Sequence, residues 1–146
     1  PMHDIGKVGI PDKILLKPTP LTPEEEEIMH QHPLIGEAIV KPVRSLSKAV
    51  DLVRHHHEKF DGTGYPAGLK GEQIPLGARI LAVVDTYDSM ITDRPYRKRL
   101  SIEMARAELA RCSGTQYDPK IVEAFLRVLD KKDARQPAQA ADPQAS

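Results

Sequence analysis

The chain has 146 residues, with 21 basic and 21 acidic side chains and therefore no formal net charge. This length fits one domain, and the charge balance excludes bulk electrostatic attraction to nucleic acid or anionic lipid as the main binding force. One cysteine excludes a disulfide framework, and the short apolar runs exclude a membrane span, so we expect a cytoplasmic domain without nucleic-acid or membrane partners.

The chain opens on a histidine–aspartate pair, His3-Asp4, in a position that is unfavourable for chemistry. Chain ends fray, and a metal ligand or catalytic group there would be poorly held. We therefore expect this sequence to be an N-terminally truncated fragment, with further helices of the intact protein preceding Pro1.

A strong helix start follows at Thr22. Thr22, Pro23 and Glu25 occupy the N-cap, N1 and N3 positions of a capping box. The predicted helix ends at about His32, because Pro33 has no backbone N–H to donate and disfavours continuation.

Two more helices are predicted before the end of the histidine run 55–57. One covers residues 34–40 and is ended by Pro42. The next begins at a serine N-cap, Ser45 or Ser47, and continues into the histidine run, because its apolar residues recur on one helical face.

A loop and three helices fill the rest of the chain. Residues 61–71 are rich in glycine and have no helical period, which predicts a loop. Helices are predicted from Pro75, from the N-cap Ser101 and from Asp118, with a basic connector over 93–99. The predicted fold class is therefore all-α.

The end of the chain is poor in apolar residues. Residues 131–146 consist largely of Ala, Gln, Pro and charged residues, so we expect a disordered tail. The single predicted domain therefore covers residues 1–130.

Six candidate metal ligands are spread over these elements: His3, Asp4, His32, His56, His57 and Asp85. Imidazoles suit transition metals, and a carboxylate can bridge two of them while offsetting their charge. Asp85 lies in an apolar stretch, where an unpaired carboxylate would be costly to bury. Each group alone also has an ordinary explanation, as a helix-end residue, a solvated histidine run or a partnered core acid. Their joint occurrence favours a site for two or three iron, manganese or zinc ions.

Two ordered motifs connect these residues to a family. Residues 3–7 (HDIGK) and 56–66 (HHEKFDGTGYP) resemble the HD signature and the HHExxDGxGYP pattern of the HD-GYP phosphodiesterases. The match continues through residues 32–33, 85–88 and 93–97. The resemblance implies an all-helical bundle of the HD superfamily with a glycine-rich GYP loop.

The resemblance also implies a reaction, the metal-dependent hydrolysis of the bacterial second messenger cyclic di-GMP to pGpG or GMP through a metal-bridging hydroxide. It implies two or three metal ions, generally iron or manganese, with Asp4 as the bridging carboxylate. Lys7, one turn beyond Asp4, would contact the scissile phosphate or assist the leaving oxygen. The implied substrate contacts are Gly62, Gly64, Tyr65, Pro66, Arg94 and Arg97.

Further domains and partners follow from the same resemblance. A receiver or sensor domain is expected upstream, and diguanylate cyclase (GGDEF) proteins and a second copy of the chain are further candidate partners. Family members carry another metal-ligating His, and in some a Glu, on a helix before the HD motif, and this sequence lacks that segment. We therefore expect the isolated chain to be impaired in activity.

Two alternative functions stay open. One is an HD-type phosphohydrolase that acts on another cyclic dinucleotide or nucleotide, because a fold and a metal site do not determine specificity. The other is a catalytically silent module that binds a ligand or a partner protein.

Overall fold

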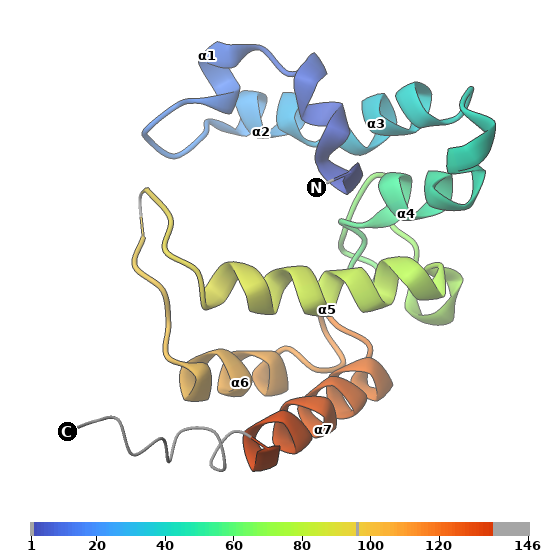
Figure 1. The fold of residues 1–146 in the computed structure, drawn as a ribbon. Helices are drawn as coiled ribbons and strands as arrows, with labels where there is room; N and C mark the ends of the chain where they lie inside the picture. Colours follow the sequence, from blue (N-terminus) through green and yellow to red (C-terminus); the bar gives the residue numbers. More distant parts are fainter. Residues whose placement is uncertain (1, 96, 136–146) are drawn as a thin grey trace.

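The computed structural model describes residues 2–95 and 97–135 (Figure 1). Within these residues the chain is helical and has no β-strand, which confirms the all-α prediction. The α-helices are α1 (Asp12–Leu15), α2 (Pro23–Met29), α3 (His32–Val40), α4 (Val50–His55), α5 (Leu76–Met90), α6 (Ile102–Arg111) and α7 (Pro119–Arg135). The 3-10 helices are η1 (Met2–Gly9), η2 (Arg44–Ala49) and η3 (Gly71–Gln73). Over the described part of the chain, every helix falls short of the length and apolar character that crossing a membrane requires.

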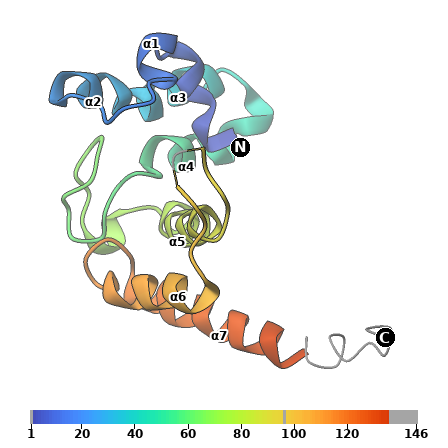
Figure 2. The ribbon, with the colours of Figure 1, turned by 90° about the vertical axis from the view of Figure 1, so that its left-hand side faces the viewer.

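The long helix α5 lies between two groups of helices. The group formed by η1 and α1–α4 is on one side, and α6 and α7 are on the other (Figures 1 and 2). On the second side, Val83 and Tyr87 of α5 pack with Leu109 of α6 and Val122 of α7 in one buried apolar cluster. This burial of apolar surface holds α5 in place and leaves its opposite side available to the candidate site.

On the other side of α5, η1 and α3 cross at very short range. A Cβ atom at Gly6 would lie 1.7 Å from the carbonyl oxygen of His32, and one at Gly36 would lie 3.3 Å from the backbone nitrogen of Gly6. Only glycine allows the two backbones to approach this closely. The crossing brings the first residues of the chain next to the start of α3.

The predicted N-caps of three helices are confirmed. The side-chain oxygen of Thr22 accepts a hydrogen bond from the amide of Glu25 at 3.2 Å, and that of Ser101 accepts one from the amide of Met104 at 3.2 Å. Asp118 accepts in the same way from the amide two residues on, at 2.9 Å. These caps depend on neighbouring residues alone, and so they can be predicted from sequence.

Two predicted helix boundaries in the first half of the chain are wrong. The helix that starts at Pro23 ends at Met29, and His32 begins α3 instead of ending the preceding helix. Pro33 is compatible with this start, because the first turn of a helix has no use for the missing N–H. The segment with the two serines forms η2, and α4 begins only at Val50 without a side-chain cap.

The predicted start of the disordered tail is also wrong. Helix α7 continues through Arg135, so residues 131–135 are helical. Arg106 of α6 forms ion pairs with Asp130 and, at 3.4 Å, with Asp133, and these contacts attach the last turns of α7 to its neighbour. Residues 136–146 lie outside the described residues.

Candidate metal centre

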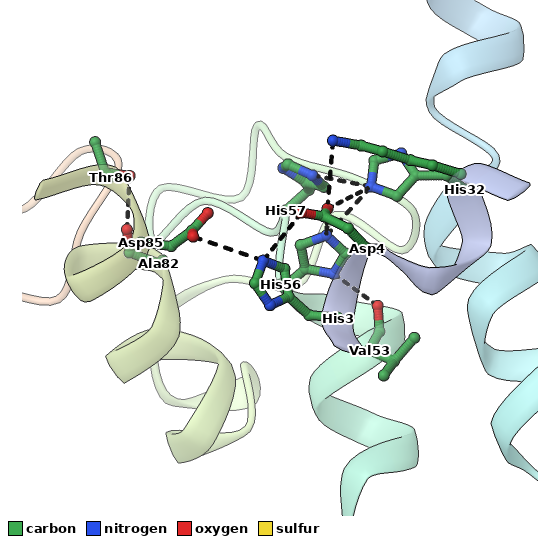
Figure 3. Close-up of polar contacts among 10 residues, drawn as sticks. His3, Asp4, His32, Val53, His56, His57, Ala82, Asp85 and Thr86 are labelled. Carbon is green, nitrogen blue, oxygen red and sulfur yellow. Dashed lines mark hydrogen bonds and ion pairs between the residues drawn. The ribbon is translucent and has the colours of Figure 1, made fainter. Parts of the chain in front are cut away.

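The side chains predicted as metal ligands meet between η1, α3, the end of α4 and α5 (Figure 3). Asp4 is central, because its Oδ1 atom lies 3.7 Å from Nε2 of His32 and 3.6 Å from Nε2 of His56. Ligand atoms of Asp4, His32, His56 and His57 all lie within 4.8 Å of one another. The chain therefore contains a candidate metal-binding cluster.

Backbone carbonyl groups orient two of the imidazole rings. Nδ1 of His32 donates to the carbonyl oxygen of Met29 at 2.8 Å, and Nδ1 of His56 donates to that of Val53 at 2.7 Å. In neutral rings with a protonated Nδ1, Nε2 carries only a lone pair, and yet the two Nε2 atoms are 3.2 Å apart. A cation beside both lone pairs would remove their repulsion. The donor set therefore fits a transition-metal ion, with both rings oriented for it.

His57 adds a third imidazole to the cluster. Its Nε2 atom lies 3.1 Å from Nε2 of His32. Burial and the neighbouring imidazoles of His56 and His32 lower the pKa of His57 to about 3, and burial also lowers the pKa of His32. Both rings are therefore neutral at pH 7, which is the form that binds a metal.

His3 connects Asp4 to α5. Its Nε2 atom lies 3.3 Å from Oδ2 of Asp4 and 3.6 Å from Oδ1 of Asp85, but this buried nitrogen has no hydrogen-bond partner among the described residues. A metal ion would satisfy a nitrogen held between two carboxylates. The side chain of Asp85 is 50% exposed, so the expected apolar surroundings are wrong. The buried side of α5 is the one that carries Val83, which faces α6 and α7.

Lys7 lies one turn from Asp4, as predicted. Its Nζ atom is 3.5 Å from Oδ1 of Asp4, and its side chain is 41% exposed. Burial alone would raise the pKa of Asp4, but contacts with His3 and His56 and the charge of Lys7 together hold it below the usual value. The centre thus combines an ionised carboxylate with an ammonium group that is accessible to an anion.

The glycine-rich loop places an aromatic ring beside the histidines. Gly62 has a positive φ of 85°, and a Cβ atom at Gly64 would lie 2.3 Å from a backbone nitrogen of the preceding turn. Tyr65, which Pro66 follows, stacks on His57 with ring centroids 5.0 Å apart and planes 17° apart. Burial and the nearby carboxylate of the centre raise the pKa of Tyr65 to about 12, so its hydroxyl is protonated.

Glu58 organises this loop, a role that sequence reasoning missed. Its buried carboxylate accepts hydrogen bonds from the amide of Ala67 at 2.8 Å and from the amide of Leu69 at 3.0 Å. His55 contacts the same carboxylate at 3.2 Å. The one sequence feature that pointed to this role is the position of an acidic residue inside the histidine motif. Its hydrogen-bond partners lie nine and eleven residues away in an irregular loop, and contacts of that kind cannot be predicted from the spacing of residues.

The two arginines predicted to bind substrate lie in the connector after α5. The guanidinium of Arg97 donates to the carbonyl oxygen of Ser89 at 2.9 Å, near the end of α5, and the backbones of Arg94 and Arg97 are paired. Among the described residues, neither arginine has a recorded contact with the metal cluster. Their binding role remains a prediction.

A cavity of about 110 Å³ adjoins the candidate centre. Its wall includes His56, His57 and Glu58 on one side and Asp85 and Thr86 of α5 on the other. A small polar group placed in this cavity would lie against the proposed metal ligands.

The sequence model of the HD domain family matches residues 1–121. The chain belongs to the HD domain family. It is 49% identical over 130 residues to a cyclic di-GMP phosphodiesterase of Thermotoga maritima, which covers 88% of this chain and 35% of that protein. It is 43% identical over 129 residues to a cyclic di-GMP phosphodiesterase response regulator of Xanthomonas campestris, covering 87% of this chain and 34% of that protein.

A solved structure has the same fold. The crystal structure of a cyclic GMP-AMP specific phosphodiesterase of Vibrio cholerae superposes with a TM-score of 0.68 at 20% identity, over 92% of this chain and 37% of that chain. The HD-domain chain therefore spans about a third of the length of these proteins. The family model and the curated relatives confirm the HD-GYP resemblance, and the solved structure confirms the HD fold.

Proposed function

We propose that this HD domain hydrolyses cyclic di-GMP in a metal-dependent reaction. One observation supports the metal dependence above all others: two imidazoles with backbone-bonded Nδ1 atoms direct their Nε2 lone pairs at each other and at Asp4. The substrate is supported by the two curated relatives, which are named as cyclic di-GMP phosphodiesterases. The HHExxDGxGYP motif at residues 56–66 supports the same substrate.

The proposed centre holds two or three metal ions, iron or manganese. Asp4 would bridge two of them, and the remaining ligands would be His3, His32, His56, His57 and Asp85. When bound, such ions lower the pKa of water and offset negative charge on phosphoryl oxygens.

The protein's own residues would position the phosphodiester. Lys7 is the nearest ammonium group to Asp4, so it would bind a phosphoryl oxygen or stabilise the leaving oxygen. Tyr65 and the turn residues Gly62, Gly64 and Pro66 would form the edge of the substrate site. Arg94 and Arg97 would contact the ligand from the connector after α5, where one guanidinium nitrogen of Arg97 already donates to the carbonyl oxygen of Ser89.

The curated relatives are about three times as long as the segment they share with this chain, and this supports a proposal about further domains. The residues through Arg135, where α7 ends, would belong to the phosphodiesterase domain of a longer chain with an upstream receiver or sensor domain, as the name of the response-regulator relative suggests. Diguanylate cyclases and a second copy of the chain are the other proposed partners.

The test is turnover of cyclic di-GMP by the longer protein and by this chain, each loaded with Mn²⁺ or Fe²⁺ under anaerobic conditions. Chromatography of the products should show pGpG or GMP from the longer protein, and chelation should abolish the reaction. A panel with 3′3′-cyclic GMP-AMP and cyclic di-AMP tests the alternative substrates. Metal binding without turnover of any of these compounds would instead favour a silent binding module.

A further inference from the structure

Tyr65 belongs to a stack of three rings that extends outside the proposed ligand set. Its ring is nearly parallel to that of His30, with centroids 3.8 Å apart and an interplanar angle of 11°. It is also stacked on His57, at 5.0 Å and 17°. His30 is the exposed residue directly after Met29, the last residue of α2, and it belongs to none of the motifs singled out in the sequence.

His57 differs from the other two clustered histidines in how its ring is held. Backbone carbonyls accept from Nδ1 of His32 and of His56 and so set the orientation of both rings. Over the part of the chain that the structure describes, no such acceptor is recorded for His57, whose one polar contact is with Nε2 of His32. Rotation of the His57 ring is therefore limited by packing against neighbouring rings: those of His56 at 4.1 Å and His32 at 4.8 Å inside the cluster, and that of Tyr65 on the loop side at 5.0 Å.

The loop backbone alone does not hold Tyr65 in this orientation. The turn around Gly64 places the backbone of Tyr65, whose amide donates to the carbonyl oxygen of His57 at 3.3 Å. The ring can still rotate about its side-chain bonds, and the neighbour that covers it closely is His30.

We infer that His30 is a positioning residue: it holds Tyr65 against His57 and thereby sets the orientation of the His57 imidazole in the centre. The expected effect on metal binding rests on the proposed metal centre. The stacking of His30 on Tyr65, by contrast, is present in the protein without any metal. The role needs a flat ring at position 30 and neither ring nitrogen.

The test compares His30→Ala, His30→Phe and the control Gln31→Ala in the full chain. Gln31 is the exposed neighbour of His30, and its side chain forms no hydrogen bond or ion pair with the other described residues. Two quantities are measured: hydrogen exchange of the peptide spanning residues 57–70 in the metal-free protein, and Mn²⁺ affinity by calorimetry. Loss of a group that orients a metal-binding histidine typically weakens metal affinity about 10–100-fold.

We expect faster exchange in the loop and at least tenfold weaker Mn²⁺ binding for His30→Ala, with both restored in His30→Phe and unchanged in Gln31→Ala. Wild-type behaviour of His30→Ala would overturn the inference. A phenylalanine variant as impaired as the alanine variant would overturn it too, because a ring nitrogen would then be essential. If the wild-type protein binds no Mn²⁺, the proposed metal centre fails, while the exchange measurement still decides the role of His30.

Discussion

Asp4 contacts four ionisable side chains of the candidate centre and its surroundings: His3, Lys7, His32 and His56. Its two oxygens face His3 at 3.3 Å, His56 at 3.6 Å and Lys7 at 3.5 Å. These contacts outweigh the effect of burial and keep its pKa below the usual value, so the carboxylate is ionised in the folded protein at neutral pH. An ionised carboxylate among imidazoles is the kind of group that can bridge two metal ions and offset their charge.

We predict that Asp4→Asn removes at least one metal ion per chain and nearly all hydrolysis of cyclic di-GMP by the longer protein. An amide has the shape of the carboxylate but no charge, so the fold should persist while metal binding is lost. Metal analysis by mass spectrometry and circular dichroism measure the two effects. Asp51→Asn, which changes an exposed acid on α4, should leave both unchanged. Full metal occupancy in Asp4→Asn would contradict the bridging role.

A second prediction concerns a single residue of the loop region: we predict that Glu58→Gln destabilises the fold. Both oxygens of Glu58 accept from amides of the loop, and the –NH2 group of glutamine would oppose one of these donors. A buried group left without its partner costs about 1–3 kcal/mol, which urea unfolding followed by circular dichroism can measure. Glu72→Gln changes an exposed side chain, paired only at 3.8 Å with Lys120, and should shift stability by less than about 1 kcal/mol. Equal midpoints for the two variants would rule out this role for Glu58.

At the level of elements, the crossing of η1 and α3 decides whether the centre can form. It places His3 and Asp4 beside His32, and it depends on the missing Cβ atom at Gly6, which would otherwise lie 1.7 Å from a backbone oxygen. We predict that Gly6→Ala lowers the free energy of unfolding by about 3 kcal/mol or more, since a backbone atom cannot yield to a methyl group as a side chain can. Metal binding should weaken with it, because η1 must move away from α3.

The matched control is Gly77→Ala on α5. A Cβ atom there would lie 3.2 Å from the end of the Leu52 side chain, which can move aside, and alanine favours a helix over glycine by about 0.5–1 kcal/mol. Denaturation should therefore find Gly77→Ala as stable as wild type or slightly more stable. If Gly6→Ala were equally stable, the crossing would not need glycine.

The helix boundaries show which features of the fold can be predicted from the sequence and which cannot. The helix starts at Thr22 and Ser101 follow from side chains three residues from their partners, and they are confirmed. The start of α3 at His32 is predicted wrongly because a proline suits the first turn of a helix as well as it ends one, and Pro33 lies in the first turn of α3. The meeting of the six candidate ligands was predictable because the motifs are long and ordered. Glu58 and His30 were not, since their contacts depend on the path of an irregular loop.

Across the whole molecule, the candidate centre joins two parts of the fold that meet at α5. Asp4 and His32 lie on the η1–α3 side, whereas Asp85 belongs to α5, whose other face is buried against α6 and α7 (Figures 1 and 3). In the described residues, the polar contact recorded between Asp85 and this group is the one with His3, at 3.6 Å. A metal ion bound by residues from both sides would add a strong bond where the protein alone has a weak one.

We therefore predict that chelation lowers the melting temperature of the whole domain instead of loosening only the site. A metal that binds the folded chain alone stabilises it by about 2.7 kcal/mol when its concentration is a hundred times the dissociation constant. For a domain of this size, that corresponds to roughly 5–10 °C. Calorimetric melting before and after EDTA, followed by addition of excess Mn²⁺, should show one transition that falls and then recovers. Asp4→Asn provides the control, because a variant that binds fewer metal ions should show a smaller fall in melting temperature on addition of EDTA than the wild type does. If neither EDTA nor Mn²⁺ changed the melting temperature of the wild-type protein, no metal ion would link the two sides of the molecule.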